Sequence, residues 1–322
     1  MRCFGRPQTE VVTTKSGNCE NMKLAVILVN YNGKKYNTAC IESILANVGM
    51  EELKIVVVDN ASQDASMRLL EEQYAKDGRL EFIRLDDNYG FSRANNEGIS
   101  RAKAWGADAV VLLNNDTEIA SDMLSRLWEC AGRHPGCMIA PKIYYGDDRK
   151  RIWSAGGSVS PIIKKVRHIG LDEADEGQYD RETEIRFATG CCLWIPMSVI
   201  DEAGTLDERF FLYYEDTEYS FRLCKLGIPI YYCPKAVMYH KVGASTKGAD
   251  SPLCAYYIAR NWLLCNRLHL GGRYPLFLAY YALNRTVCCL LWFVQGKKEL
   301  VRATLRGVGD YRKGRFGRAE RY

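Results

Sequence analysis

The sequence predicts an α/β fold with a doubly wound, mostly parallel sheet and a helical C-terminal extension. Strand-like apolar runs and helix-like segments alternate four times within about 130 residues, which implies right-handed crossovers. The apolar runs are nearly continuous, as is typical of strands that are buried on both faces. Each run ends in Asn or Asp, so polar side chains should gather at the carboxyl edge of the sheet, where open α/β sheets bind ligands.

The elements of the first half follow from this pattern. Strands are predicted at Lys23–Val29, Leu53–Val58, Leu80–Leu85 and Ala107–Leu113. Helices are predicted around Tyr36–Leu45, after Asp64 as the N-cap, and over Ser92–Ala104. No G-x-G-x-x-G segment follows the first strand, so the dinucleotide-binding fingerprint is absent. The Asn and Asp residues at the strand ends could contact a base and ribose, or simply populate turns.

The second half changes rhythm between residues 136 and 196, where an acidic stretch over 172–184 predicts a loop. The elements predicted beyond this loop are a strand at Thr189–Pro196, a helix at Met197–Ala203, a helix opening at Glu215, short strands at Ile228–Cys233 and Ala236–Tyr239, and helices at Ser251–Leu268 and Pro275–Val294.

Charge and cysteine content limit the function classes. Nine of the 44 Lys and Arg residues and three of the 39 acidic residues lie between Gly296 and Tyr322, which leaves 35 basic against 36 acidic residues elsewhere. This distribution argues against a nucleic-acid-binding surface over the whole protein. The 13 cysteines show no C-x-x-C spacing, and residues 1–21 lack an apolar signal-peptide core. We therefore expect reduced, buried thiols in a cytoplasmic protein.

The strand that ends at Leu113 runs directly into Asn114-Asn115-Asp116. A carboxylate at this edge can hold a divalent cation, which in turn can hold a diphosphate. The alternative is a polar turn in which Asp116 caps a helix that starts near Ile119. The sequence around this motif leaves both interpretations open.

Two later features can complete such a site. Glu215-Asp216 open a helix, and His240 ends a strand. A carboxylate and an imidazole can share one divalent ion, and Asp216 could then take a proton from an attacking hydroxyl. The alternatives are that the acidic pair only complements the helix dipole and that His240 is structural.

Together these motifs resemble the GT-A glycosyltransferases of family 2, specifically their rhamnosyltransferase-like branch. The resemblance runs from about Met22 to Thr246 and more weakly to the C-terminus. The segments that carry it occur in the family's order: Val29-Asn30-Tyr31-Asn32, Val57-Val58-Asp59-Asn60-Ala61-Ser62, Asn88-Tyr89-Gly90-Phe91, Ala94-Asn95-Asn96, Leu113-Asn114-Asn115-Asp116, Thr189-Gly190, Phe210–Glu218 and Tyr239-His240.

The resemblance implies a GT-A domain over 22–246, after a disordered leader at 1–21 and before a helical, partly apolar and basic extension at 247–322. It also implies a nucleotide-sugar site made of polar residues at the strand ends: Asn30, Asp59, Asn95, Asn114, Asn115, Asp116 and Glu215. Asn114 replaces the first acid of the family's D-x-D motif, so it brings a hydrogen bond but no charge. Asp216 would be the catalytic base, and His240 would join Asp116 in binding Mg²⁺ or Mn²⁺.

The implied activity is an inverting sugar transfer from a nucleoside-diphosphate donor, plausibly dTDP-L-rhamnose, to a hydroxyl of a glycan or lipid-linked glycan. The alternatives are a UDP-hexose donor and a non-catalytic module that binds nucleotide sugars or glycans. Retention of Asp116, Asp216 and His240 argues for catalysis. The sequence leaves the acceptor, the linkage and the oligomeric state open.

The predicted helix at 275–294 is apolar and about long enough to span a bilayer, but Asn284 and Arg285 lie at its centre. We therefore expect it to lie in the membrane interface or to pack on the catalytic domain. The basic residues after Gly296 suit an anionic membrane surface, or else form a solvated tail. The expected location is the cytoplasmic face of the membrane, as a peripheral protein.

Overall fold

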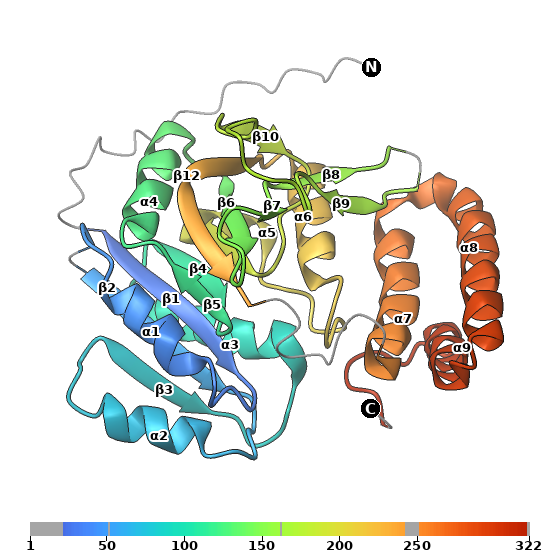
Figure 1. Ribbon diagram of the computed structural model, residues 1–322, viewed down its shortest axis with the longest axis horizontal. Helices are drawn as coiled ribbons and strands as arrows, with labels where there is room; N and C mark the ends of the chain where they lie inside the picture. The colour runs from blue at the N-terminus through green and yellow to red at the C-terminus, as the bar shows by residue number, and fades with distance from the viewer. Residues whose placement is uncertain (1–21, 51, 162, 242–250, 321–322) are drawn as a thin grey trace.

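The computed structural model describes residues 22–50, 52–161, 163–241 and 251–320, so the leader predicted at 1–21 lies outside the described residues. In the first half the predicted alternation of strand and helix is confirmed (Figure 1). Its elements are β1 (Lys23–Asn30), α1 (Asn37–Leu45), β2 (Glu52–Asp59), α2 (Ser66–Gln73), β3 (Leu80–Arg84), α3 (Gly90–Trp105) and β4 (Ala109–Asn114).

The strand order reverses beside β1. This strand pairs in parallel with β2 on one side and with β4 on the other, which gives the order β3-β2-β1-β4. In open α/β sheets such a reversal is the point at which ligands bind, just beyond the carboxyl ends of the strands. β1 ends at Asn30 and β4 ends at Asn114, so the predicted polar edge lies at this switch point.

The second half extends the same sheet with strands of both directions. β11 runs antiparallel between β4 and β6, and β12 runs parallel to β6, so the sheet is parallel on one side of β4 and mixed on the other. The elements are β5 (Thr117–Ile119), α4 (Met123–Arg133), β6 (Met138–Tyr145), β7 (Ile152–Ser154), β8 (Gly157–Val159), β9 (Val166–His168), β10 (Thr183–Ile185), β11 (Cys192–Pro196), α5 (Met197–Ala203), α6 (Glu215–Leu226) and β12 (Ile230–His240).

The alternative in which Asp116 caps a helix that starts near Ile119 is wrong. Residues Thr117–Ile119 form β5, which pairs antiparallel with β12, and the next helix starts only at Met123. The Thr117 hydroxyl donates to the Asn114 carbonyl at 2.7 Å and so stabilises a turn instead of a helix start. Asp116 therefore lies between two strands and caps no helix.

Two smaller expectations also change. The two short strands predicted before His240 are one strand, β12, with an irregularity between Cys233 and Val237. The residue that flanks α2 is Ala65 rather than Asp64. The Asp64 carboxylate still accepts a hydrogen bond from the Ser66 N–H at 3.0 Å, so it satisfies a first-turn donor from one residue further out.

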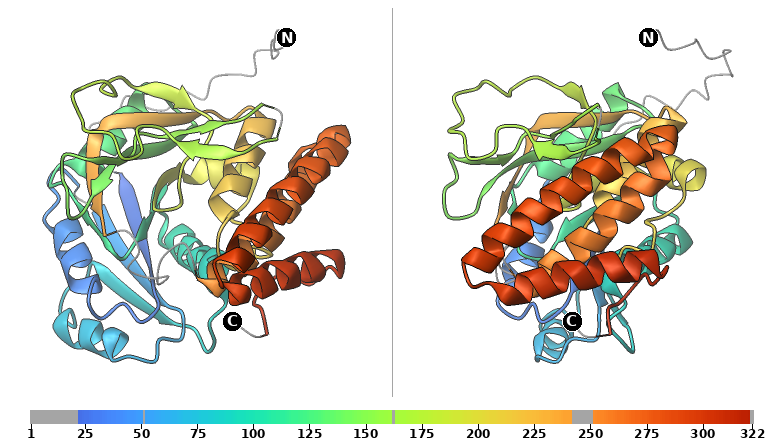
Figure 2. Two further views of the ribbon diagram at one scale, coloured as in Figure 1. Left: turned by 45° about the vertical axis from the view of Figure 1, so that its right-hand side comes forward. Right: turned by 90° about the vertical axis from the view of Figure 1, so that its right-hand side faces the viewer.

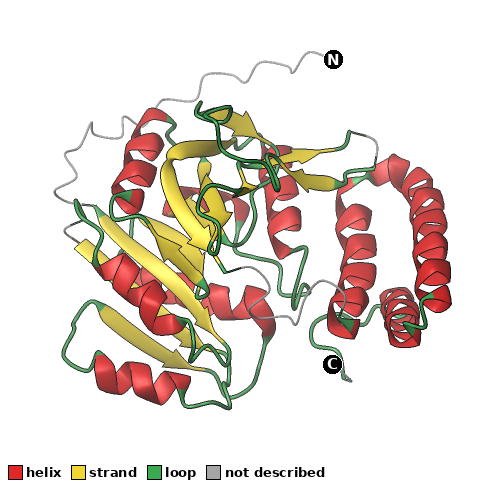
Figure 3. Ribbon diagram, viewed as in Figure 1, coloured by secondary structure: helices red, strands yellow, loops and turns green. Residues whose placement is uncertain are grey.

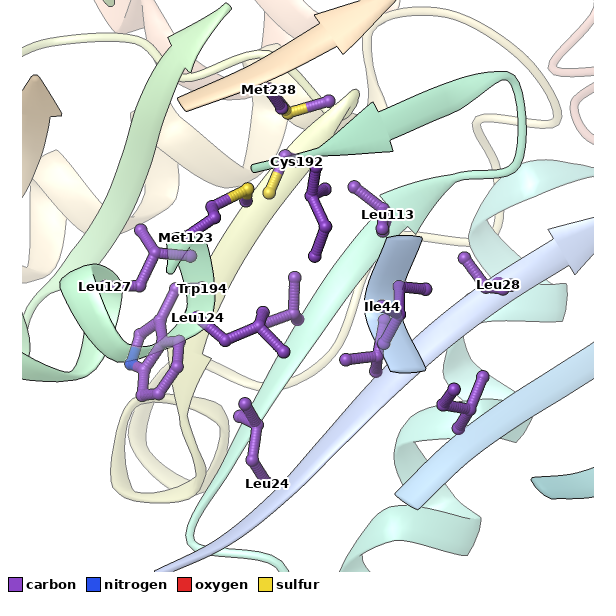
Figure 4. Close-up of a cluster of buried hydrophobic side chains, with 14 of the residues drawn as sticks. Leu24, Leu28, Ile44, Leu113, Met123, Leu124, Leu127, Cys192, Trp194 and Met238 are labelled. Atoms are coloured by element: carbon purple, nitrogen blue, oxygen red, sulfur yellow. The ribbon is translucent and has the colours of Figure 1, made fainter. Parts of the chain in front are cut away.

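Helices cover both faces of the sheet (Figure 3). On one face α1 and α4 pack their apolar side chains against β1, β4 and β11, as the side chains of Ile44, Leu124, Leu24, Leu113 and Trp194 show in Figure 4. On the other face α3, α5 and α6 bury a second cluster. This two-sided burial explains why the central strands are apolar almost throughout.

The C-terminal extension forms three helices, α7 (Pro252–His269), α8 (Tyr274–Val294) and α9 (Lys298–Arg312), with a short 3-10 helix at Gly271–Arg273. α8 and α9 lie on the outer side of α7 (Figure 2). The residues after α9 return to the sheet domain: Arg318 pairs with Asp87, and the Gly317 N–H donates to the Arg209 carbonyl at 3.1 Å. The extension is therefore joined to the sheet domain through specific contacts.

Candidate active site

The ends of β1 and β2 are organised around the buried side chain of Asn30. Its amide nitrogen donates to Asp59 Oδ1 at 2.7 Å and to the hydroxyls of Ser62 and Ser66. Its amide oxygen accepts from Asn37 Nδ2 at 2.8 Å and from the Gly33 N–H at 3.1 Å. These hydrogen bonds hold the Asp59 carboxylate in place, and a contact between Asn30 and the donor remains a prediction.

Side-chain amides connect the end of β1 to the end of β4. Asn115 Nδ2 donates to Asn37 Oδ1 at 2.7 Å, and Asn37 in turn donates to Asn30. Gly33 lies within this cluster, because a Cβ at this position would come within 2.3 Å of Asn115 Nδ2 and 2.6 Å of Asn30 Oδ1. Only glycine fits here, so the loop after β1 is held closely against the Asn114–Asp116 turn.

The structure brings Asp116 and His240 together. His240 Nε2 lies 3.4 Å from Asp116 Oδ1, and both side chains are buried. Strand pairing explains the contact, because His240 stands opposite Thr117, the residue after Asp116. The Trp153 ring meets the imidazole edge-on at 4.7 Å. Among the described residues, the second ring nitrogen of His240, Nδ1, is buried without a hydrogen-bond partner.

Glu215 and Asp216 form the first turn of α6. Asp216 is half-buried, and its carboxylate accepts hydrogen bonds from the N–H groups of Gly190 at 2.9 Å and Thr217 at 2.6 Å. Burial raises the pKa of Asp216 above its ordinary value, although these hydrogen bonds act in the opposite direction. Burial and the neighbouring Asp216 carboxyl also raise the pKa of Glu215 well above its usual range. The pair therefore contains carboxyls that hold protons more tightly than in water.

One short segment connects the two acidic centres. The Gly190 N–H donates to Asp216, while the carbonyl of the next residue, Cys191, accepts from the Asn114 N–H at 3.0 Å. Burial raises the pKa of the Cys191 thiol well above its usual value, and the charges of Asp116 and Asp216 add to this effect. Asp116 and Asp216 therefore both lie near the Gly190–Cys191 segment.

Asn95 is the predicted site residue that the structure connects least to the others. Its side chain is buried in α3 and donates to the Phe91 carbonyl at 2.9 Å, within the first turns of its own helix. Asp59 instead receives its hydrogen bonds from Asn30 and the Ser62 N–H. A contact between Asn95 and the donor remains a prediction.

Several residues around the site were not expected from the sequence. The sequence assigned no role to Gly190. Its backbone N–H donates a hydrogen bond to Asp216, a residue 26 positions away that only the folded chain brings close. Trp153 packs between His240 and His168, with ring centroids 4.6 Å from those of His168. Burial, and to a smaller extent His240, lowers the pKa of His168 to about 4, so His168 is neutral at physiological pH. No local sequence pattern predicts the positions of Trp153 and His168 beside the site.

The mixed, mostly parallel sheet with helices on both faces has the GT-A fold. Residues 25–204 match the model of glycosyl transferase family 2, and the chain belongs to this family.

Similar curated proteins extend over most of the chain. It is 24% identical over 302 residues to dTDP-rhamnosyl transferase RfbF of Shigella flexneri, covering 89% of this chain and 96% of that protein. It is 23% identical to N-acetylglucosaminyl-diphospho-decaprenol L-rhamnosyltransferase of Mycobacterium tuberculosis, covering 79% and 87%. Among solved structures, the mannosyltransferase PcManGT of Pyrobaculum calidifontis, in complex with GDP-Man and Mn²⁺, superposes with a TM-score of 0.58 at 11% identity, covering 91% and 88% of the two chains.

Proposed function

We propose that this glycosyltransferase is inverting, that it takes L-rhamnose from dTDP-L-rhamnose, and that Asp216 is its general base. The observation that carries the proposal is the half-buried Asp216 carboxylate, held by the Gly190 N–H beside the segment that leads to Asp116. The names of the two rhamnosyltransferase relatives support the choice of sugar. The lipid carrier in the name of the second relative supports a lipid-linked glycan as acceptor.

The chemistry requires one base on the acceptor side. Asp216 would accept the proton of the acceptor hydroxyl while that oxygen forms a bond to the anomeric carbon from the face opposite the nucleotide. The bond from this carbon to the diphosphate oxygen breaks, and its electron pair leaves with the nucleoside diphosphate. The anomeric configuration is therefore inverted, and no protein nucleophile is needed. A positioned base of this kind contributes about 10²–10⁴-fold to the rate.

Asp116 and His240 fit a divalent cation by their chemistry. A carboxylate and an imidazole together suit Mn²⁺, and carboxylates also suit Mg²⁺. The Nε2 atom of His240 faces Asp116 Oδ1 at 3.4 Å and is therefore the ring nitrogen that would bind an ion shared with this carboxylate. When bound, such an ion would neutralise charge on the departing diphosphate. Asp116 and His240 would hold it, and the backbone around Asn114 and Asn115 would orient the phosphates.

Asp59 would receive the base or ribose of the donor, in the orientation that Asn30 imposes on its carboxylate. Asn95 and Asn114 would add hydrogen bonds to the same ligand. Glu215, whose pKa is raised by burial and by Asp216, would be protonated more readily than a carboxyl in water and could donate a hydrogen bond to the sugar. These assignments make the carboxyl edge of β1, β2 and β4 the donor site.

Asp216→Asn tests the base directly. The amide keeps the shape of the carboxylate but cannot accept the proton, so we expect turnover to fall by about 10²–10⁴-fold while donor binding is retained. Calorimetric titration with dTDP-L-rhamnose and rhamnosyl transfer to a synthetic lipid-diphosphate sugar supply the two readings. Asp201→Asn, an exposed carboxylate on α5, is the matched control. Wild-type turnover in Asp216→Asn would remove Asp216 from this role.

The same assay with a panel of donors tests the sugar. We expect dTDP-L-rhamnose to be used in preference to UDP-glucose, UDP-N-acetylglucosamine and GDP-mannose. Preference for a UDP-hexose would overturn the donor assignment but leave the mechanism intact. Binding of a donor without hydrolysis or transfer would instead favour a non-catalytic module.

We also propose that α8 and α9 bind an anionic membrane surface on the cytoplasmic side. Among the described helices, one stretch, Gly271–Val294, is long and apolar enough to cross a membrane. Most of its large apolar side chains face outward, and Leu290, Leu291 and Val294 are 61%, 56% and 85% exposed. The guanidinium of Arg285 instead lies 5.4 Å from the Trp262 ring of α7 and donates a hydrogen bond to Asn284, so its charge faces the protein and not the exposed apolar side of α8. An apolar outer face beside the basic residues of α9 suits the bilayer interface.

Sedimentation with vesicles tests this surface. With phosphatidylglycerol-containing vesicles at low salt we expect the chain to pellet, and we expect the double variant Leu290→Glu/Leu291→Glu to stay in the supernatant. Val48→Glu is the control, because Val48 is 63% exposed but lies after α1. If the wild-type chain does not pellet, or the double variant pellets equally well, the membrane assignment is wrong.

A further inference from the structure

The backbone immediately before the α6 carboxyl pair is held in an unfavourable conformation. Tyr213 and Tyr214 have φ angles of 66° and 75°, and Tyr214 flanks the first residue of α6, Glu215. Each non-glycine residue in the left-handed region costs about 1–2 kcal/mol. Two consecutive left-handed tyrosines therefore need support from outside the turn, as strained backbone at functional sites does generally.

The support comes from α7, in the C-terminal extension. The side-chain amide of Asn261 donates to the carbonyls of Leu212 at 2.9 Å and Tyr213 at 2.8 Å. Asn261 is fully buried, so these carbonyls have no access to water as a substitute on that side. One NH₂ group thus holds both peptide oxygens that lead into the left-handed pair.

Arg260 fixes the orientation of this amide. Its Nε donates to Asn261 Oδ1 at 3.0 Å, so the NH₂ group of Asn261 must face the Leu212 and Tyr213 carbonyls. The Arg260 guanidinium is itself buried, donates to the Gly317 carbonyl at 2.8 Å, and lies over the rings of Tyr256 and Tyr257. The clamp is therefore anchored in α7 and in the segment after α9.

We infer that Asn261 is a positioning residue for catalysis: its amide holds the left-handed Tyr213–Tyr214 turn and thereby sets the place of the Asp216 carboxylate. The inference rests on the proposed role of Asp216 as base. It assigns the C-terminal extension a part in the chemistry, in addition to any contact with a membrane. Of the proposed donor contacts, Glu215 directly follows the held turn, whereas the others lie on α3 and around the ends of β1, β2 and β4, so we expect loss of the clamp to lower turnover much more than donor affinity.

Asn261→Ala is the first test, with Asn266→Ala as its matched control. Asn266 is equally buried on the same helix, but its amide donates within α7, to the Trp262 carbonyl. We expect Asn261→Ala to lower kcat about a hundredfold, the scale of a 1 Å misplacement of a catalytic group, with a much smaller change in affinity for dTDP-L-rhamnose. Asn266→Ala should leave kcat near the wild-type value. Equal kcat values in the two variants would overturn the inference.

A rescue experiment separates strain from a general loss of packing. In the Asn261→Ala background, Tyr213→Gly and Tyr213→Ala both remove the ring, but only glycine adopts a positive φ without penalty. We expect the glycine double variant to turn over about tenfold faster than the alanine one. Equal rates in the two double variants would show that the left-handed turn is not what Asn261 holds.

The results also distinguish this inference from the proposed function. If Asp216→Asn is inactive and Asn261→Ala is fully active, the base stands and the clamp fails. If Asp216→Asn is active, the base assignment fails, and amide exchange over residues 210–217 then decides the clamp by itself. Faster exchange there in Asn261→Ala than in Asn266→Ala supports the clamp, and equal exchange contradicts it.

Discussion

Gly90 is the position at which a single methyl group should do the most damage to the joint between the two halves of the site. It is the first residue of α3 and has a φ of +86°. A Cβ there would come within 2.4 Å of the Phe211 carbonyl oxygen and 2.6 Å of its ring. The carbonyl cannot simply retreat, because it accepts a hydrogen bond from the Phe91 N–H at 2.8 Å.

The expected loss of stability in Gly90→Ala has three parts. The left-handed φ costs about 1–2 kcal/mol in a residue with a Cβ. Forcing an extra methyl group into a packed interior costs about 1–3 kcal/mol. Loss of the hydrogen bond from Phe91 to Phe211 adds about 1 kcal/mol. We therefore expect the free energy of unfolding to fall by about 3–6 kcal/mol, with a lower kcat because Phe211 leads into the Tyr213–Asp216 segment.

Urea denaturation with Gly106→Ala as the control isolates the steric part. Gly106 has nearly the same φ, +83°, but nothing lies within 4 Å of its added Cβ. This control should lose only the conformational part, about 1–2 kcal/mol. The difference between the midpoints, at equal m-values, then measures the contact with Phe211. If Gly90→Ala is no less stable than Gly106→Ala, the close approach of α3 to Phe211 is refuted.

Three further predictions concern charge. Because burial raises the pKa of Glu215, its folded-state penalty is absent below the unfolded value near 4.5 and grows as pH rises. Glu215→Gln should thus be more stable than wild type at pH 7 but equal to it near pH 4 in thermal melts; lower stability at pH 7 contradicts this. Asp216 must be ionised to act as base, so kcat/KM should fall as pH drops through its raised pKa, and a flat profile down to pH 4 would argue against it. Asp116→Ala should weaken binding of dTDP-L-rhamnose about a hundredfold in Mn²⁺ but much less without metal, and equal calorimetric affinities would remove Asp116 from the metal site.

The parallel half of the fold could be predicted because its signals are local. Each strand of β1, β2 and β4 is a short apolar run, and the rule that such strands align their carboxyl ends predicts that Asn30, Asp59 and Asn114 lie at one edge of the sheet. The antiparallel insertion of β11 between β4 and β6 has no such signal, because strand order there depends on pairing between distant segments.

The sequence predicts which residues form the candidate site, but it does not predict their hydrogen-bond partners or the backbone conformation around them. Asp116 and His240 were expected to share a ligand, and strand pairing brings them to 3.4 Å. The network that ties Asn30 to Asp59, Ser66 and Asn37 was not foreseen, because it joins segments that are distant in sequence. The left-handed turn at Tyr213 was not foreseen, because tyrosine has no local preference for positive φ and the turn depends on a side chain from α7.

The order of the site residues along the chain also determines when donor binding and sugar transfer become possible during synthesis. The proposed donor site lies within residues 30–240, whereas the proposed positioning of Asp216 needs Asn261, and Arg260 in turn bonds to Asn261 and to Gly317, beyond α9. Domains generally fold as units during synthesis, the N-terminal one first. We therefore expect a nascent chain to hold a nucleotide sugar well before it can transfer one.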